Sequence, residues 1–588
     1  MRRLADQSAP HQLAKNIVLR HLPLTFASSY RSCIAGVETS YRYHTGQRRS
    51  CGQCQTLGYR IAVFRSFPDI DPKGTALPER SLGSDSSGAQ GSTSTLCCTA
   101  STMVLPTTPA LLTLLITNAT LDSFNQVRQS CLVDRYYGTY GDQSLFMVDP
   151  NLHCDPFKLK LDLDWQWDLI SVHPDHELLF LKKMEIEDAI SGEDTLIGGL
   201  ERLVEYTSND PPAASGAQWP LIEVAPTYSI LYHAEHSAIL SISPHLLPYI
   251  DNALPPSYKA YALPKIPLPS RRVPEEAKRR IRLWTDLVEY DDDVNRIVEG
   301  LSSRKLRQDV RYLTGEDSNS PILSRSSFSE GGRLAAEWIF EQINQTGAEC
   351  ELKQFLPGFA PNVICKYQSL DESAGTIILS SHYDSRGSRG KFRAPGGDDN
   401  GSGTAAILSI ARAIARNGIV FKSNVQLIAF AGEEQGLWGS RGYALELWNQ
   451  GANITLMAHS DMLAYRVPGE PAQLAFPKIG TGEVVDLISK VASIYSPELV
   501  VGSTPACCSD HQTFHEQGFP AAQLFERGGP IADPMYHNSG DLSDREGYDF
   551  EQLRSITKAL MATLLHTAEY ELLGWPCVRQ QTSESDMV

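Results

Sequence analysis

The chain has 588 residues, more than one hydrophobic core ordinarily holds, so two or more domains are expected. Its hydrophobic content of 42% and charged content of 21% are typical of a globular protein and exclude collagen-like and wholly disordered classes. The net charge of −17 argues against general nucleic-acid binding, because a phosphate backbone requires a basic protein surface.

The first 102 residues carry no sustained helix or strand periodicity and end in a Ser/Gly-rich tract, SLGSDSSGAQGSTST. We expect residues 1–102 to be disordered or a non-native leader. The apolar segment that follows, 103–126, resembles the core of a secretory signal, which would make Met103 the start of translation. An ordinary buried segment is the alternative. Its prolines and threonines make it a poor transmembrane span, and no integral membrane segment is predicted.

Residues 127–275 are expected to form a smaller, partly β N-terminal accessory domain. Short apolar and aromatic runs such as LFMVDP and YSILYHAEHSAILSIS are separated by turn-forming stretches such as NDPPAASG. We find no chemistry-bearing group of residues in this region. The domain is a candidate for self-inhibition, as a pro-segment lying over the site, or for binding a partner.

From 276 to 575 the pattern changes to alternating helices and strands. Expected helices cover 294–313, 329–347, 404–418 and 438–451, and expected strands cover 362–367, 375–385, 424–434 and 454–463. Continuous apolar strands between helices indicate an α/β domain, with a mostly parallel central sheet covered by helices on both faces. Residues 576–588 are expected to be a flexible tail.

Polar side chains gather where these strands end. They are His382, Asp384, Asp398, Glu433, Glu434 and Asp461, followed further along by His537. Because the carboxyl ends of parallel strands meet at one edge of a sheet, we expect these side chains to lie together. Two histidines with several carboxylates suit zinc or a similar divalent ion.

The motifs around these residues occur in a specific order. They are SSHYDS, APGGDDNGSGTAA, AFAGEEQGLWGSRGYA, HSDML, CSDHQTFHEQGFPA and YHNSGD. In this order they resemble the motifs of the M28 family of co-catalytic zinc aminopeptidases, and the resemblance covers roughly residues 276–575. It implies a zinc-exopeptidase fold with two Zn²⁺ ions per chain and peptides as substrates.

The resemblance also implies a role for each residue. His382 and His537 would each bind one zinc ion, Asp398 would bridge the two ions, and Glu434 and Asp461 would complete the two ligand sets. Glu433 would be the general base for a metal-bridged hydroxide, and the bond between Asp398 and Asp399 would be cis. Relatives that carry a tyrosine just before CSDH use it to support the oxyanion; this chain lacks it, and Tyr536 is the candidate to replace it.

Other polar residues have supporting or structural roles. Asp384 lies two residues after His382 on the same strand face, so we expect it to hold the other nitrogen of that imidazole. His511 and His515 have helical spacing but no glutamate between them at the spacing of a zinc helix. We therefore interpret this pair, and His459, as structural.

The predicted function is a zinc-dependent exopeptidase, most simply an aminopeptidase. Three alternatives remain open: a carboxypeptidase of the same family, a glutaminyl-cyclase-like zinc transferase, and a catalytically inactive binding scaffold. The complete ligand set and the intact Glu433 disfavour the last two.

The compartment is predicted from weaker signals. The signal-like run, three Asn-x-Thr sequons and the placement of cysteines fit a secreted or vacuolar glycoprotein, with a cytosolic location as the alternative. Cys350 and Cys365 flank a predicted hairpin and could form a disulfide in an exported protein.

Overall fold

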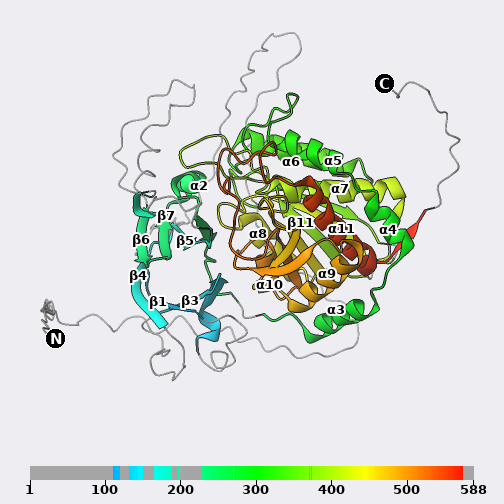
Figure 1. Ribbon diagram of the computed structural model, residues 1–588. Helices are drawn as coiled ribbons and strands as arrows, with labels where there is room; N and C mark the ends of the chain where they lie inside the picture. The colour runs from blue at the N-terminus through cyan, green and yellow to red at the C-terminus, as the bar shows by residue number, and fades with distance from the viewer. Residues whose placement is uncertain are drawn as a thin grey trace, which may run out of the picture. The chain divides into compact units, whose positions relative to one another are not determined.

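Figure 1 shows the computed structural model, which describes residues 110–118, 131–149, 165–187, 196–198, 200, 228–268, 271–369, 371, 374–506 and 508–573. The expectations for residues 1–102 and 576–588 fall outside these ranges. Residues 101–588 belong to one compact unit. Within it we distinguish an accessory module, residues 110–262, from an α/β domain, residues 275–573.

The α/β domain is built on a six-stranded sheet. Its order is β17 (Ala521–Leu524), β14 (Ile454–Ser460), β11 (Thr376–His382), β13 (Asn424–Phe430), β10 (Asn362–Tyr367) and β9 (Glu349–Lys353). The first four strands are parallel, whereas β10 and β9 run antiparallel to their neighbours. The prediction of a mostly parallel sheet is therefore confirmed, with an antiparallel edge.

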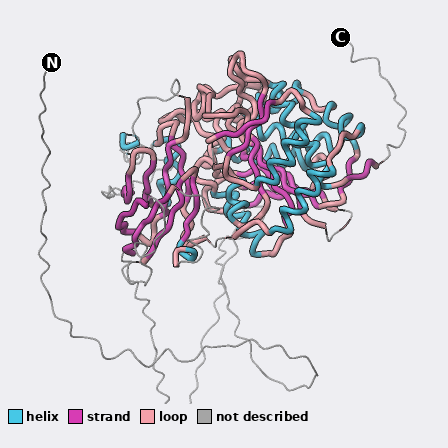
Figure 2. Tube along the Cα trace, turned by 60° about the horizontal axis from the view of Figure 1, so that its bottom comes forward, coloured by secondary structure: helices cyan, strands magenta, loops and turns pink. Residues whose placement is uncertain are grey.

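Helices cover both faces of this sheet (Figures 1 and 2). They are α3 (Glu275–Leu287), α4 (Asp292–Glu299), α5 (Ser303–Leu313), α6 (Glu330–Asn344), α7 (Gly401–Asn417), α8 (Trp438–Asn449), α9 (Gly482–Tyr495), α10 (His511–Glu516) and α11 (Phe550–Ala568). Ile377 and Leu379 of β11 pack into the core beneath α7 and α11, while Ile378 between them joins the core beneath α8 and α10. This alternation is the two-residue period of a strand buried on both faces.

Helix ends follow local capping chemistry. Ser329 caps α6 by accepting from the N–H of Gly332, and α7 ends at Gly418 in the left-handed conformation. The single helix expected over 294–313 is wrong. The chain leaves the helix at Gly300 and restarts at Ser302, whose hydroxyl caps α5, so that α4 and α5 are separate helices.

The accessory module contains two four-stranded antiparallel sheets. The first has the order β2 (Tyr136–Tyr140), β3 (Gln143–Val148), β1 (Ala110–Thr117) and β4 (Trp165–Val172). The second has the order β6 (Tyr228–His233), β7 (Ser237–Ile242), β5 (Glu177–Lys183) and β8 (Tyr258–Ala262), with the short helices η3 (Val133–Arg135), η4 (Pro244–Tyr249) and α2 (Ile250–Ala253) in the same module. Side chains of both sheets share one apolar core.

The signal-like segment has a structural role in this module. Its residues Ala110–Thr117 form β1, which pairs with β3 on one side and β4 on the other, and Leu114 and Ile116 lie in the core. The described residues of this segment therefore agree with the alternative of a buried segment, and the secretory-signal interpretation stays a prediction. None of the described helices is long and apolar enough to cross a membrane.

Shorter pairings complete the α/β domain. β12 (Ile419–Phe421) pairs with β18 (Tyr570–Leu572), and β15 (Gln473–Pro477) pairs with β16 (Val500–Thr504). The predicted disulfide is present: Cys350 on β9 lies directly opposite Cys365 on β10, and the two are bonded.

Replacing both Cys350 and Cys365 by serine is expected to lower the free energy of unfolding. The bond closes a loop with a sequence separation of 15 residues, and a loop of that size contributes about 3 kcal/mol through the unfolded chain. Guanidinium unfolding of the double variant and the wild type, each with and without reductant, measures the loss. If reductant lowers the free energy of unfolding of both proteins equally, the Cys350–Cys365 bond contributes nothing to stability.

Candidate metal centre and active site

The predicted site residues lie at one edge of the central sheet. His382 is the last residue of β11, Asp461 directly follows β14, and Glu433 and Glu434 follow the end of β13 at Phe430. Because β11, β13 and β14 are parallel, all three carboxyl ends open on the same side. His537 reaches this edge from the loop after β17.

The two adjacent glutamates are oriented by the loop that carries them. Gly432 has φ 73°, a conformation that glycine adopts readily, and it turns the chain sharply after the strand. The carboxylate of Asp384 then accepts hydrogen bonds from the backbone N–H groups of both Glu433 and Glu434, each at 3.3 Å. With their backbone fixed, the two side chains enter different halves of the site.

The site comprises two groups of converging ligand atoms. One contains His382, Glu433 and Asp461, and the other contains Asp399, Glu434 and His537. Asp399 joins them, because one of its carboxylate oxygens lies 3.4 Å from Nε2 of His382 and the other 3.4 Å from Nε2 of His537. Asp461 lies 3.3 Å from His382, and Glu434 lies 3.2 Å from His537.

The assignment of Asp398 as the bridging residue is corrected by this geometry. Asp398 turns away from the two histidines: its carboxylate accepts from the N–H of Ala464 at 2.8 Å and pairs with the carboxyl group of Glu526. The cis peptide bond lies between Asp399 and Asn400, not between Asp398 and Asp399. The error is one of register within an Asp-Asp pair, in which either carboxylate satisfies the sequence pattern.

The loop carrying Asp399 is held by charged groups that the sequence analysis did not single out. Asp541, within the YHNSGD motif, accepts from the N–H groups of Asp398 and Asp399 at 3.0 Å and is paired with Arg545. The buried guanidinium of Arg325 donates to the carbonyls of Tyr383 at 2.7 Å and of residues 395 and 396 in the loop. Backbone bonds of this kind fix where the Asp399 carboxylate lies.

The supporting role predicted for Asp384 is realised in a different way. The Nδ1 of His382 lies 3.1 Å from the backbone carbonyl of Asp384 and 3.6 Å from its carboxylate. Asp384 thus orients His382 mainly through its main chain, and its carboxylate serves the glutamates. The aromatic ring of Tyr536 stacks on the imidazole of His537, with ring centroids 3.8 Å apart.

The histidines interpreted as structural contact groups other than the candidate metal ligands. His459 is buried between the hydroxyls of Ser380 and Ser509, each at 2.9 Å. His511 lies 2.9 Å from the carbonyl of Ile479, and none of these histidines, nor His515, joins a possible metal group in the described part of the chain.

The sequence analysis also missed two cations at the site. Lys259, on β8 of the accessory module, places its ammonium 2.5 Å from the Glu433 carboxylate, and the burial of both side chains leaves them 8% and 0% exposed. Arg386, four residues beyond His382, lies with its guanidinium 3.0 Å from Nδ1 of His537. Arg386 directly follows the SSHYDS motif, whereas nothing in the sequence of the module marks Lys259.

The donor set fits divalent cations. Each of the six converging residues is at most 6% exposed, and among the described residues the carboxylate oxygens of Glu434 and the Nε2 of His537 have no hydrogen-bond partner. Buried charges left unpaired are costly, and metal ions satisfy them. Burial raises the pKa of Glu433 well above its usual value, although Lys259 and His382 oppose the shift.

Fold and site together define an α/β protein whose candidate metal ligands lie at the strand ends of the central sheet. The family model for Peptidase family M28 matches residues 362–564. A "Probable leucine aminopeptidase" of Arthroderma otae is 30% identical over 266 residues, which cover 42% of this chain and 68% of that protein. The chain belongs to peptidase family M28, and it is a hydrolytic exopeptidase.

Two further proteins are similar to parts of this chain. "Leucine aminopeptidase 1" of Sclerotinia sclerotiorum is 26% identical over 276 residues, covering 44% of this chain and 70% of that protein. The crystal structure of the Legionella pneumophila LapA aminopeptidase aligns with 68% of this chain and 99% of its own, at 18% identity and a TM-score of 0.46.

Asp399→Asn is expected to lower the metal content of the purified protein, whereas Asp398→Asn is expected to retain it. The first change removes the negative charge between the two ligand groups, and the second alters a residue that faces Ala464 and Glu526. Metal analysis by mass spectrometry on both variants makes the comparison. If Asp398→Asn lost metal and Asp399→Asn retained it, Asp398 would be the bridging residue, as the sequence predicted.

Proposed function

We propose that the protein is a zinc-dependent aminopeptidase that releases N-terminal residues from peptides, with two zinc ions per chain. One observation carries the proposal: two ligand groups of one histidine and two carboxylates each, joined through Asp399, are buried at the strand ends. Histidine nitrogen and carboxylate oxygen are a ligand set that zinc accepts. In this proposal His382 and Asp461 hold one ion, Glu434 and His537 hold the other, and Asp399 serves both.

The general base in this proposal is Glu433. Zinc, when bound, would lower the pKa of a water molecule and polarise the scissile carbonyl. Glu433 accepts the proton of the attacking water and delivers it to the leaving amine. Burial raises the pKa of Glu433 above its usual value, the direction that favours proton transfer by a carboxylate general base. Asp384 keeps this carboxylate in place through the backbone N–H of Glu433.

Tyr536 is the proposed support for the oxyanion. It is buried beside His537, and its hydroxyl retains its proton because burial raises its pKa well above the usual value, although Lys259 opposes the shift. A protonated phenol can donate a hydrogen bond to an oxygen that gains negative charge.

An apolar N-terminal residue is the substrate that the surroundings favour. Met462, which follows Asp461, packs with Phe525, Ile531 and Tyr536 in an apolar cluster beside the metal-binding groups. The relatives named leucine aminopeptidase agree with this preference.

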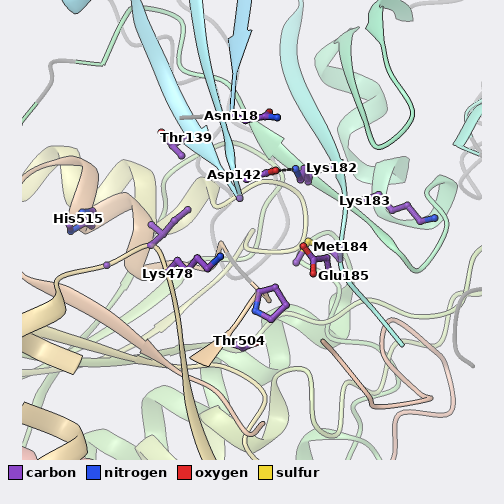
Figure 3. Close-up of a pocket in the computed structure, with 14 residues that line it drawn as sticks. Asn118, Thr139, Asp142, Lys182, Lys183, Met184, Glu185, Lys478, Thr504 and His515 are labelled. Carbon is purple, nitrogen blue, oxygen red and sulfur yellow. Dashed lines mark hydrogen bonds and ion pairs between the residues drawn. The ribbon is translucent and has the colours of Figure 1, made fainter. Parts of the chain in front are cut away.

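We also propose that the accessory module inhibits the enzyme in the form described. Lys259 forms an ion pair with the proposed general base, which cannot accept a proton while it is held in this way. Met184 of the module packs against Met462 and Tyr536 and also lines a cavity of about 460 Å³, shown in Figure 3, together with Lys478 and Thr504 of the α/β domain. Met184 thus belongs both to the lining of this cavity and to the apolar cluster that contains Met462 and Tyr536.

A secreted or vacuolar location is proposed as well. The Cys350–Cys365 bond, and the disulfide-bonded state of Cys131 and Cys508, are supporting observations, because disulfides persist in oxidising compartments. The Asn344 and Asn453 side chains of two sequons are exposed, as attachment of a glycan requires.

Glu433→Gln is expected to lower kcat by about 10²- to 10⁴-fold, the usual contribution of a general base, while zinc content stays near that of the wild type. Aminoacyl-anilides and N-blocked peptides would be compared as substrates for both proteins. The aminopeptidase proposal is supported if the wild type cleaves substrates with a free amine and the variant does not. Cleavage of blocked peptides alone assigns a carboxypeptidase, and formation of pyroglutamate assigns the cyclase.

Lys259→Met is expected to raise the rate on leucyl-anilide. In the proposed inhibited form Lys259 is paired with Glu433, and in the active form the pair is broken. If the ion pair stabilises the inhibited form by about 1.4 kcal/mol, its loss raises the population of the active form about tenfold. The matched control is Lys182→Met, which removes a cation of the same module that pairs with Asp142 outside the site. A lower rate for Lys259→Met with an unchanged control would show that Lys259 assists catalysis and does not inhibit it.

A further inference from the structure

Arg386 connects the metal-binding edge of the sheet to the accessory module. Its side chain is 3% exposed. The Nε donates to the carbonyl of Asp251 at 2.8 Å, and one terminal nitrogen donates to the carbonyl of Tyr258 at 2.8 Å. The other terminal nitrogen donates to the carbonyls of Leu254 at 2.5 Å and Pro255 at 3.0 Å.

These contacts use nearly all of the donors that the guanidinium has. Arginine carries five N–H groups, and four of them point at carbonyls of one short segment, 251–258. The fifth points at Nδ1 of His537, 3.0 Å away. Residues 251–258, which we call the module loop, are also tied to the α/β domain by Gln435, whose side-chain amide donates to the Asp251 carboxylate at 2.9 Å.

The module loop also contacts His537 directly. The carbonyl of Pro256 lies 2.9 Å from Nδ1 of His537. A carbonyl can only accept, so this contact requires the proton to be on Nδ1, which leaves the lone pair of Nε2 free. That Nε2 faces Asp399 at 3.4 Å and Glu434 at 3.2 Å.

Two arrangements of His537 are therefore available, and they exclude each other. If Nδ1 accepts from Arg386, the proton is on Nε2, and that nitrogen cannot bind a cation. If Nδ1 donates to Pro256, Nε2 is a ligand. Groups that hold the second nitrogen of a metal-binding histidine in this way fix its tautomer and its orientation.

We infer that the module loop is a positioning element of the metal centre: Arg386 holds the loop so that the carbonyl of Pro256 fixes His537 in its metal-binding tautomer. The inference rests on the proposed function. It assigns the accessory module a role opposite to that of Lys259, because one end of the segment supports a metal-binding residue while Lys259, just beyond it, pairs with the base. In this scheme, activation moves the Lys259 side chain away from Glu433, while the module loop keeps its contacts with Arg386 and His537.

The test is zinc binding by the full-length chain, measured by competition with chelators of graded affinity and by metal analysis. Arg386→Ala is expected to leave zinc affinity at the site that contains His382 unchanged and to weaken affinity at the site that contains His537 by about 10- to 100-fold, the range for groups that orient a metal ligand. Arg386→Lys keeps the positive charge without the five-donor geometry and is expected to weaken the same site by at least about tenfold.

The matched control is Arg527→Ala. Arg527 also joins the module to the α/β domain, through Glu187 at 2.9 Å, but lies outside the metal-binding groups. It is expected to bind zinc as the wild type does. The inference would be overturned if Arg386→Lys left the zinc affinity of both sites unchanged. It would also be overturned if Arg527→Ala lost as much zinc affinity as the Arg386 variants. A wild-type chain that takes up no zinc overturns the proposed function itself.

Discussion

The concentration of negative charge at one edge of the central sheet is the constraint around which the rest of the site is arranged. The carboxylates of Asp399, Glu433, Glu434 and Asp461 converge there with little access to water. Four such groups repel one another and lose solvation, so the fold tolerates them only with cations among them. Lys259 and the two histidines partly compensate for this charge in the protein alone, and divalent ions, when bound, would complete the compensation.

Several supporting contacts hold this arrangement through backbone atoms. Asp384 accepts from the N–H groups of the adjacent glutamates, and Asp541 accepts from those of the aspartate pair. In each case one carboxylate holds two consecutive residues, and their side chains then point to different places. This explains how two neighbouring acidic residues at a strand end can have different roles, one toward a metal and one toward water.

Much of this could be predicted from the sequence because the signals are local. Apolar periodicity indicated β11, β13 and β14, and polar residues at the ends of those strands indicated the site. The register within the Asp398-Asp399 pair could not be predicted, since it depends on Ala464 and Glu526, which are distant in the chain. Lys259 and Arg386 act across the contact with the accessory module, and no local pattern reports such a contact.

The Cys350–Cys365 bond lies at an exposed boundary of the central sheet. β9 is the outermost strand on that side, with β10 next to it. An outer strand that separates leaves a row of unpaired N–H and C=O groups on its neighbour, and such a row can pair with another chain. The covalent link keeps β9 over β10, so it protects the domain against intermolecular sheet formation. A chain kept in a reducing environment would lack this protection at the edge farthest from β17.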